Sequence, residues 1–238
     1  MPSALEKLKE DTRFNIMRVV MPLRHKLRRS PLAKYMGWAG LYETRGIDRY
    51  LADRWQGKDE GWDPAPPAVK RLEIINEIKA HGIRNFVETG TYLGMTTSLV
   101  AAHVDKVWTI EVSERLYGLN KQVYADIPNI EFLLGGSEDV LPQIVPQIQG
   151  NTLYWLDGHF SAGITGMTDV ETPIMKEVET IAKHNHKGRC VLLIDDIRCF
   201  NGTHDYPTLD ALKNKLTALG YQDIIVRWDI LRCWRDEA

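Results

Sequence analysis

The sequence has little cysteine: Cys190, Cys199 and Cys233 are the only three among 238 residues. They show neither the paired spacing of a disulfide framework nor that of a zinc site, so we expect reduced thiols. No run reaches the roughly 18 apolar residues that a membrane-spanning helix needs, and residues 1–11 are too charged for a signal peptide. We therefore expect a cytoplasmic protein without a transmembrane segment.

The chain also has little net charge, −2, and lacks the interleaved basic and aromatic residues that are typical of nucleic-acid binding. We expect no nucleic-acid partner. The charge is uneven, because residues 1–40 hold nine Lys or Arg against three acids, which gives +6 there and −8 for the rest. With Pro22 and Pro31 as breakers, residues 1–67 are predicted to form an extension of short helices. It is either a lid, a dimer or docking arm, or a basic face packed on the core.

From residue 68 to residue 238, strand-like and helix-like patterns alternate. This rhythm predicts a parallel sheet with helices on both faces. The last two strand patterns, 221–226 and 230–234, are joined by a tight connection and are predicted to be antiparallel. The other expected strands are 84–88, 107–111, 130–134, 152–156 and 190–194, and the expected helices are 69–81, 95–103, 114–125, 138–148, 172–184 and 208–219.

The most informative motif is Glu88-Thr-Gly-Thr-Tyr-Leu-Gly94, between an apolar run and a helical pattern. Gly90 and Gly94 let the backbone pass close to a ligand, and Thr96 or Thr97 can supply a hydroxyl at the helix start. The next apolar run ends on Glu111, where a nucleotide-binding α/β fold holds ribose hydroxyls. An acid precedes Gly90 and the third glycine of a dinucleotide motif is missing, so cationic S-adenosylmethionine suits this turn better than an NAD pyrophosphate.

Acids follow two further strand patterns. Asp157 comes after one of them, and Asp195 and Asp196 come after another. Residues at the carboxyl ends of parallel strands meet at one edge of the sheet, where ligands bind. Carboxylates there repel one another unless a hydroxylated ligand, a sulfonium or ammonium group, or a metal shares the space.

Taken in order, these segments resemble the motifs of class I S-adenosylmethionine-dependent methyltransferases. The segment Gly135-Gly-Ser-Glu-Asp-Val-Leu-Pro-Gln143 looks most like catechol O-methyltransferase. The resemblance covers residues 83–235 and implies a Rossmann-like α/β sheet of seven strands, five parallel plus a C-terminal antiparallel pair, with helices on both faces. It implies S-adenosylmethionine as cofactor, with Glu88, Gly90, Tyr92 and Thr96 at the methionine end, Glu111 on the ribose, Ser137 and Glu138 beside the adenine, and Asp157 also at the cofactor.

Metal-dependent O-methyltransferases of the catechol and macrolide-sugar types, which the chain resembles here, hold one magnesium by three oxygen ligands. The resemblance implies Asp157, Asp195 and Asp196 as these ligands, with Asp157 also in a catalytic role. The metal would bind two vicinal hydroxyls of the acceptor and lower the pKa of one of them. The alternative is that Asp195 and Asp196 merely cap a loop.

The candidate general base is His159. Catechol enzymes carry a lysine three residues after the first metal aspartate, but here that position is Phe160. A histidine of near-neutral pKa can accept a hydroxyl proton, and macrolide-sugar methyltransferases are similar in using one near this site. Alternatively, His159 only hydrogen-bonds the loop 161–165.

The expected function is therefore magnesium-dependent O-methylation of a small diol-containing acceptor. The loops 161–166 and 201–206 are polar rather than aromatic, which favours a sugar or glycosylated metabolite over a flat catechol. Two alternatives remain open: a metal-independent methyltransferase whose aspartates hold an amine or a sugar, and a methyltransferase-like domain that binds without catalysis. A homodimer through the N-terminal helices is also expected.

Overall fold

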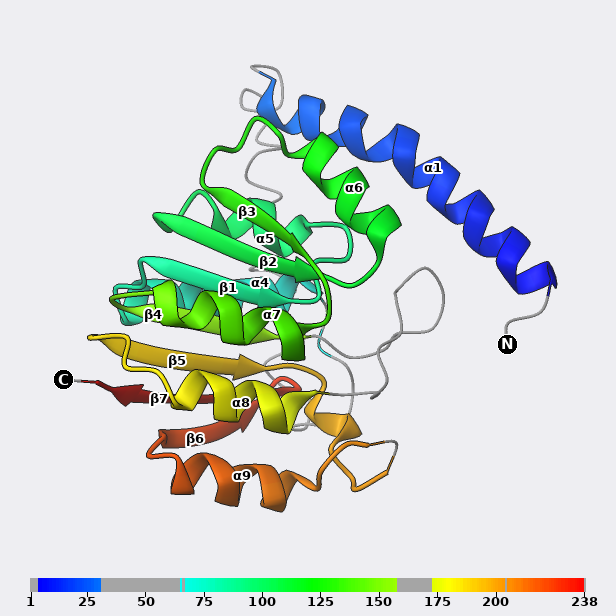
Figure 1. Ribbon diagram of the computed structural model, residues 1–238. Coiled ribbons are helices and arrows are strands. Elements are labelled where there is room, and N and C mark those ends of the chain that lie inside the picture. Colours follow the sequence, from blue (N-terminus) through cyan, green and yellow to red (C-terminus); the bar gives the residue numbers. More distant parts are fainter. Residues whose placement is uncertain (1–3, 31–64, 66, 158–172, 204, 238) are drawn as a thin grey trace.

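The computed structural model describes residues 4–30, 65, 67–157, 173–203 and 205–237. In these ranges, seven strands form one sheet in the order β3-β2-β1-β4-β5-β7-β6 (Figure 1). β1 to β5 pair in parallel, and β7 runs antiparallel to both β5 and β6, which confirms the expected five-plus-two sheet. The strands are β1 (Asn85–Thr89), β2 (Lys106–Glu111), β3 (Ile130–Leu134), β4 (Thr152–Leu156), β5 (Arg189–Ile194), β6 (Gln222–Arg227) and β7 (Ile230–Asp236).

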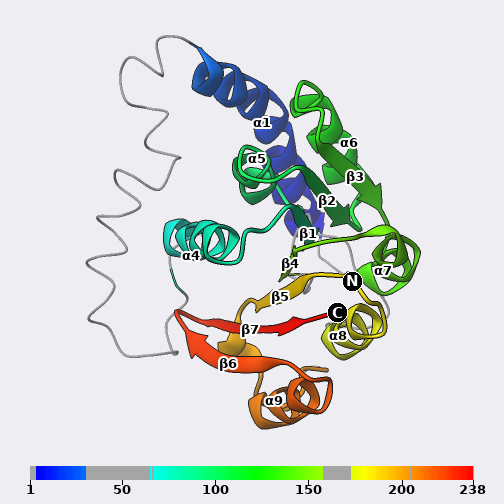
Figure 2. The ribbon, with the colours of Figure 1, turned by 90° about the vertical axis from the view of Figure 1, so that its left-hand side faces the viewer.

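Helices cover both faces of the sheet. Figures 1 and 2 show α4 and α5 on one face and α7, α8 and α9 on the other, while α6 packs beside β3. The helices of this layer structure are α4 (Pro67–Ala80), α5 (Met95–Val100), α6 (Glu114–Val123), α7 (Ser137–Ile144), α8 (Ile174–Ala182) and α9 (Leu209–Ala218), with 3-10 turns η1 (Val145–Gln147) and η2 (Ile197–Cys199). Since every parallel strand ends at the same edge, the loops that follow them gather there.

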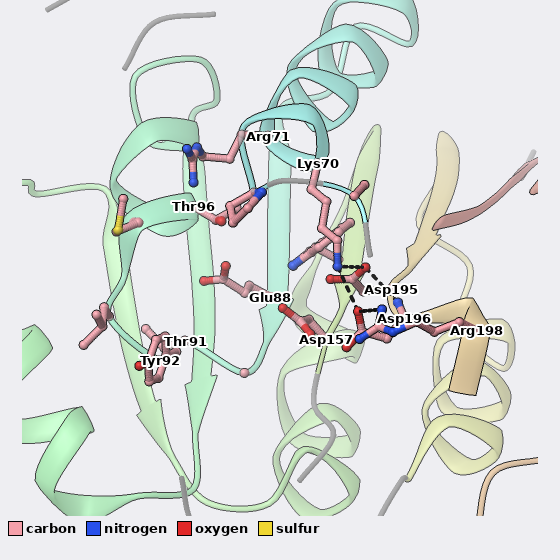
Figure 3. A pocket seen from close by; sticks show the side chains of 16 residues that line it. Lys70, Arg71, Glu88, Thr91, Tyr92, Thr96, Asp157, Asp195, Asp196 and Arg198 are labelled. Carbon is pink, nitrogen blue, oxygen red and sulfur yellow. Dashed lines mark hydrogen bonds and ion pairs between the residues drawn. The ribbon is translucent and has the colours of Figure 1, made fainter. Parts of the chain in front are cut away.

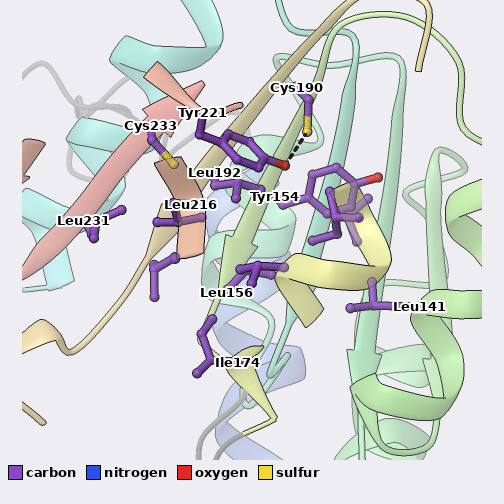
Figure 4. Packing of buried hydrophobic residues seen from close by; sticks show 14 of the residues in the cluster. Leu141, Tyr154, Leu156, Ile174, Cys190, Leu192, Leu216, Tyr221, Leu231 and Cys233 are labelled. Carbon is purple, nitrogen blue, oxygen red and sulfur yellow. Dashed lines mark hydrogen bonds between the residues drawn. The ribbon is translucent and has the colours of Figure 1, made fainter. Parts of the chain in front are cut away.

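The hydrophobic core is split by the sheet into two layers. Along β4, Leu153 and Trp155 face the α4 and α5 side, while Tyr154 and Leu156 face α7 and α8, as the period of two of a strand requires. Figure 4 shows the second layer, in which the buried thiol of Cys190 lies 3.5 Å from the Tyr221 hydroxyl. Burial on both faces explains why the central strands read as continuous apolar runs.

The helix α1 (Ala4–Arg29) corrects one expectation, since it continues through Pro22 where a break was predicted. A proline inside a helix costs about 3 kcal/mol because it removes a hydrogen bond and crowds the preceding turn. Here Phe14 and Met21 pack against α6, and His25 bonds Asp126 at 2.8 Å, so tertiary contacts outweigh that cost. The break expected at Pro31 lies outside the described residues. Among those that are described, every helix is too short or too polar to cross a bilayer.

Candidate functional site

The turn after β1 is built on left-handed backbone. Gly90, Tyr92 and Gly94 all have positive φ, at 89°, 48° and 62°. A Cβ added to Gly94 would lie 2.6 Å from the ring of Tyr124 on the chain just after α6. Gly94 is thus needed for close packing of this turn on α6, whereas Gly90 lines the cavity described below.

Tyr92 is fixed at the centre of this turn by three hydrogen bonds. Its N–H donates to Glu111 Oε2 at 2.8 Å, its carbonyl accepts from Asn120 Nδ2 at 2.6 Å, and its hydroxyl accepts from Arg13 of α1 at 2.6 Å. Such support offsets the cost of a non-glycine residue at positive φ. The turn is therefore held in one shape by β2, α6 and α1.

Glu88 is the one acid of β1; it is buried and points toward the cavity in Figure 3. Its carboxylate accepts hydrogen bonds from Thr97 at 2.5 Å and Thr109 at 2.7 Å. Burial raises the pKa of Glu88 to about 7, against the lowering effect of these two hydroxyls. Thr96, the residue singled out from the sequence, lines the cavity instead, so the two neighbouring threonines have different roles.

Glu111 ends β2, and its two carboxylate oxygens accept hydrogen bonds from the backbone N–H groups of Tyr92 and Ser113. Burial raises its pKa, and these N–H groups oppose the shift. Ser137 and Glu138 open α7, one strand further along the same edge of the sheet. Glu138 Oε2 is buried and has no hydrogen-bond partner among the described residues.

A cavity of about 540 Å³ lies at the carboxyl edge of the strands. It brings together seven of the residues predicted from the sequence, namely Glu88, Gly90, Tyr92, Thr96, Asp157, Asp195 and Asp196. Gly94, Glu111, Ser137 and Glu138 do not line it, and His159 lies outside the described residues. The acidic edge expected from the strand ends is thus one wall of a real cavity.

The three aspartates of this cavity form one cluster, in which one oxygen of each lies within 4.8 Å of the others. Sheet hydrogen bonding places them: Asp157 N donates to the Thr89 carbonyl at 3.1 Å, and Asp195 N donates to the Leu156 carbonyl at 3.0 Å. Asp195 and Asp196 are buried. Burial and the neighbouring Asp196 raise the pKa of Asp195, while Lys70 opposes the rise.

Two cations that the sequence analysis missed contact this cluster. Lys70 Nζ lies 2.6 Å from Asp195 Oδ1 and 2.8 Å from Asp196 Oδ1. Arg198 donates to Asp196 Oδ1 at 2.6 Å and also to the buried carboxylate of Asp229 (Figure 3 shows the contacts with Asp196). Burial opposes the charge of Lys70, but the two carboxylates outweigh it and raise its pKa.

A topological signal could have found Lys70. The helix expected at 69–81 precedes β1, and a helix packed on a parallel sheet runs antiparallel to its strand, so its first turn lies at the carboxyl edge. Lys70 is in that first turn of α4. No comparable pattern indicates that Arg198 reaches Asp229, because that pairing joins η2 to the β6–β7 turn.

Comparisons with known proteins agree with this architecture. No protein-family model and no curated protein matches the sequence. Among solved structures, an O-methyltransferase from Bacillus cereus in complex with SAH is 14% identical, with 82% of this chain and 91% of that chain covered and a TM-score of 0.51. The chain has the class I methyltransferase fold. A second similar structure is the O-methyltransferase TomG from Streptomyces achromogenes, involved in tomaymycin synthesis and in complex with SAM, at 15% identity, 82% and 90% coverage and a TM-score of 0.50.

The resemblance stated from the sequence is thereby confirmed at the level of the fold. In this methyltransferase fold, the sheet order and the antiparallel β7 place the turn after β1 and the aspartates after β4 and β5 at one edge. Fold alone does not determine a reaction, so the chemistry has to be argued from the residues of the cavity.

Proposed function

We propose that this chain is an S-adenosylmethionine-dependent O-methyltransferase that acts on a hydroxyl of a small diol-containing acceptor, with Mg²⁺ as a second cofactor. One observation carries the proposal: a single cavity joins the glycine turn after β1 to Asp157, Asp195 and Asp196. A methyl donor at the turn and a hydroxyl at the aspartates would then be neighbours in one enclosure, and this proximity is what methyl transfer requires.

The residues of the cofactor half fit S-adenosylmethionine. The oxygens of Glu111 are aimed by two N–H groups and keep lone pairs for ribose hydroxyls. Glu138 Oε2, buried and without a hydrogen-bond partner among the described residues, suits a donor such as the adenine amino group. Glu88 and Asp157 also line the cavity, and an ammonium or a sulfonium beside a carboxyl group favours its charged form. When bound, this cofactor supplies a methyl group attached to a sulfonium. Once the methyl group is transferred, the rest of the cofactor leaves as a neutral thioether.

The aspartate cluster fits a hard divalent cation. Asp157, Asp195 and Asp196 offer three carboxylates, the ligand type that Mg²⁺ prefers, with oxygens within 4.8 Å of one another. They would hold the metal, which would lower the pKa of the acceptor hydroxyl and orient it. Lys70 contacts two of the same carboxylates, so the metal and the ammonium would compete for these oxygens.

The proton of the acceptor hydroxyl needs a base. His159 remains the prediction for this role, with the alternative that it only hydrogen-bonds the loop 161–165; both the residue and that loop lie outside the described residues. In the other loop, Asn201 accepts hydrogen bonds from the backbone and hydroxyl of Thr203. None of the described residues of this loop lines the cavity, so the preference for a sugar or glycosylated acceptor over a flat catechol stays a prediction from the sequence. No nucleic-acid partner is proposed.

The ion pairs of Lys70 favour a second candidate, a metal-independent methyltransferase. A carboxylate pair that is already neutralised can hold an amine or a sugar by hydrogen bonds without a metal.

A homodimer through α1 is proposed as well. Its support is that Ile16, Val19, Leu23 and Leu27 are each more than half exposed on one helix, and apolar patches of this kind mark interaction surfaces.

The experiment is a calorimetric titration of S-adenosylmethionine into wild-type protein, the Glu111→Ala variant and the Glu114→Ala control, in which an exposed acid of α6 is removed. We expect Glu111→Ala to weaken binding about 30-fold or more, because it removes two charge-assisted hydrogen bonds to ribose of about 1–2 kcal/mol each. Glu114→Ala should bind like the wild type. No binding to the wild-type protein, or equal binding by all three, would contradict the cofactor assignment.

The metal is tested by calorimetric titration of Mg²⁺ into EDTA-treated wild-type protein and into EDTA-treated Asp196→Asn. Mg²⁺ binding by the wild type that is lost in Asp196→Asn supports the metal-dependent reaction. If S-adenosylmethionine binds and neither protein binds Mg²⁺, the metal-independent reaction replaces it.

A further inference from the structure

Lys70 lines the cavity but has no role of its own in the proposed reaction. We propose that Lys70 is a positioning residue that holds the Asp195–Asp196 pair together in the metal-free enzyme and has to leave this pair when a divalent cation binds. The inference rests on the proposed function only in taking Asp157, Asp195 and Asp196 as metal ligands.

The position of Lys70 is fixed by its backbone and not by its side chain. α4 packs on the sheet through Ile74 and Ile75, and Val69 packs with Ala65; all three α4 residues are 0–1% exposed, so the Cα of Lys70 is held in place. The Lys70 side chain is 15% exposed and lines the cavity. A lysine has a flexible four-carbon stem, and a cavity of about 540 Å³ gives the ammonium room to move without any change in α4.

The ammonium and a metal ion would compete for the same atoms. Lys70 Nζ lies 2.6 Å from Asp195 Oδ1 and 2.8 Å from Asp196 Oδ1. Mg²⁺ contacts its oxygen ligands at about 2.1 Å, so a metal on these two oxygens would lie next to an ammonium already in contact with both. Two cations that close repel each other strongly in a buried site.

Arg198 is anchored differently and is not expected to move. Its side chain bonds the buried carboxylate of Asp229 as well as Asp196, and its backbone N–H donates to Asp229 Oδ1 at 2.8 Å. Every ion pair of Lys70 that the structure records is with the aspartate pair. Lys70 is therefore the cation that metal binding would displace, and Arg198 would stay on the outer side of Asp196.

Competition has a measurable consequence. The apparent affinity for a metal equals its intrinsic affinity multiplied by the fraction of molecules in which Lys70 has left the pair. An unbranched neutral side chain at position 70 removes this competition and should tighten metal binding, whereas a longer cation should keep it. A purely structural role for Lys70 predicts the opposite, because a disturbed cluster would bind metal more weakly.

The experiment is a calorimetric titration of Mg²⁺ alone into EDTA-treated full-length protein. We expect Lys70→Met to bind Mg²⁺ at least about tenfold more tightly than the wild type, a change equal to about 1.4 kcal/mol. Lys70→Arg should stay within about threefold of the wild type. The matched control is Lys79→Met, which removes an exposed lysine from the last turn of the same helix. Equal or weaker binding by Lys70→Met, or no binding by any of these proteins, overturns the proposal.

A second measurement needs no variant. Amine-specific labelling of the wild-type protein, read by mass spectrometry, should modify Lys70 several-fold faster with saturating Mg²⁺ than with EDTA, while Lys79 labelling stays constant. An unchanged ratio overturns the proposal even if Lys70→Met fails to fold. Binding of S-adenosylmethionine is measured separately on the same samples, so a failure of the cofactor assignment is not mistaken for a failure of this one.

Discussion

The two halves of the cavity are held together by different forces. On the cofactor side, the backbone of Tyr92 is tied to the side chains of Glu111 and Asn120. Glu88 accepts hydrogen bonds from two threonines, and the turn after it has positive φ at Gly90, Tyr92 and Gly94. On the aspartate side, Asp195 and Asp196 are consecutive residues, and ion pairs offset their repulsion: Lys70 contacts both and Arg198 contacts Asp196. The first half is preorganised before any ligand arrives, whereas the second carries one counter-ion, Lys70, that a ligand can replace, and one, Arg198, that stays.

In the cofactor half, Gly94→Ala should lower the stability of the protein most. A Cβ there would lie 2.6 Å from Tyr124 at a φ of 62°, so Gly94→Ala combines overpacking with left-handed backbone strain. We expect a loss of about 4 kcal/mol in the free energy of unfolding, measured in urea. The control is Gly118→Ala in α6, which has nothing within 4 Å and should be neutral or stabilising. A loss below about 1 kcal/mol for Gly94→Ala would contradict the packing argument.

Glu88 tests the electrostatics of the same half. Its pKa is about 7 in the folded protein against 4.5 for the ordinary group, so the folded state holds a proton that the unfolded state has lost between these values. Stability from this group is therefore present below pH 4.5 and is lost as the pH rises to about 7. The free energy of unfolding of Glu88→Gln should exceed that of the wild type by about 3 kcal/mol near pH 8 and should equal it near pH 4. A pH-independent difference would sink the assignment.

The aspartate half should respond more weakly to a single change, because its charges are shared. Arg198→Gln leaves Asp196 paired with Lys70 but removes the side-chain partner of the buried Asp229. We expect a loss of about 2 kcal/mol in the free energy of unfolding. The exposed pair Arg84–Asp105 gives a matched control, since Arg84→Gln should cost less than about 0.5 kcal/mol. Equal effects of the two variants would mean that Arg198 is not an anchor.

The sequence was sufficient for the sheet and for the residues that follow its strands. Apolar runs bounded by glycine and acids locate strands well, and the parallel topology then brings Glu88, Asp157 and Asp195 to one edge. Helix ends were less accurate: the helix expected at 95–103 ends at Val100, because the N–H groups of Ala102 and His103 donate to carbonyls three residues back and tighten the chain there.

Three features depended on contacts between distant parts of the chain. Lys70 reaches aspartates more than 120 residues away, and Gly94 is required by Tyr124 across a helix. α1 continues through Pro22 because tertiary packing outweighs local propensity, which no window of sequence shows. His159 stays a prediction, since it lies outside the described residues.

The most direct test of the central claim is transfer of a labelled methyl group from S-adenosylmethionine to a panel of diol-containing small molecules, followed by mass spectrometry, with wild-type protein and Asp196→Asn. The account predicts a product heavier by one methyl group on a hydroxyl with the wild-type protein, strongly reduced in Asp196→Asn although this variant still binds the cofactor. Cofactor binding without transfer to any diol, or undiminished transfer by Asp196→Asn, would contradict the claim that the aspartate edge of this cavity is where the acceptor reacts.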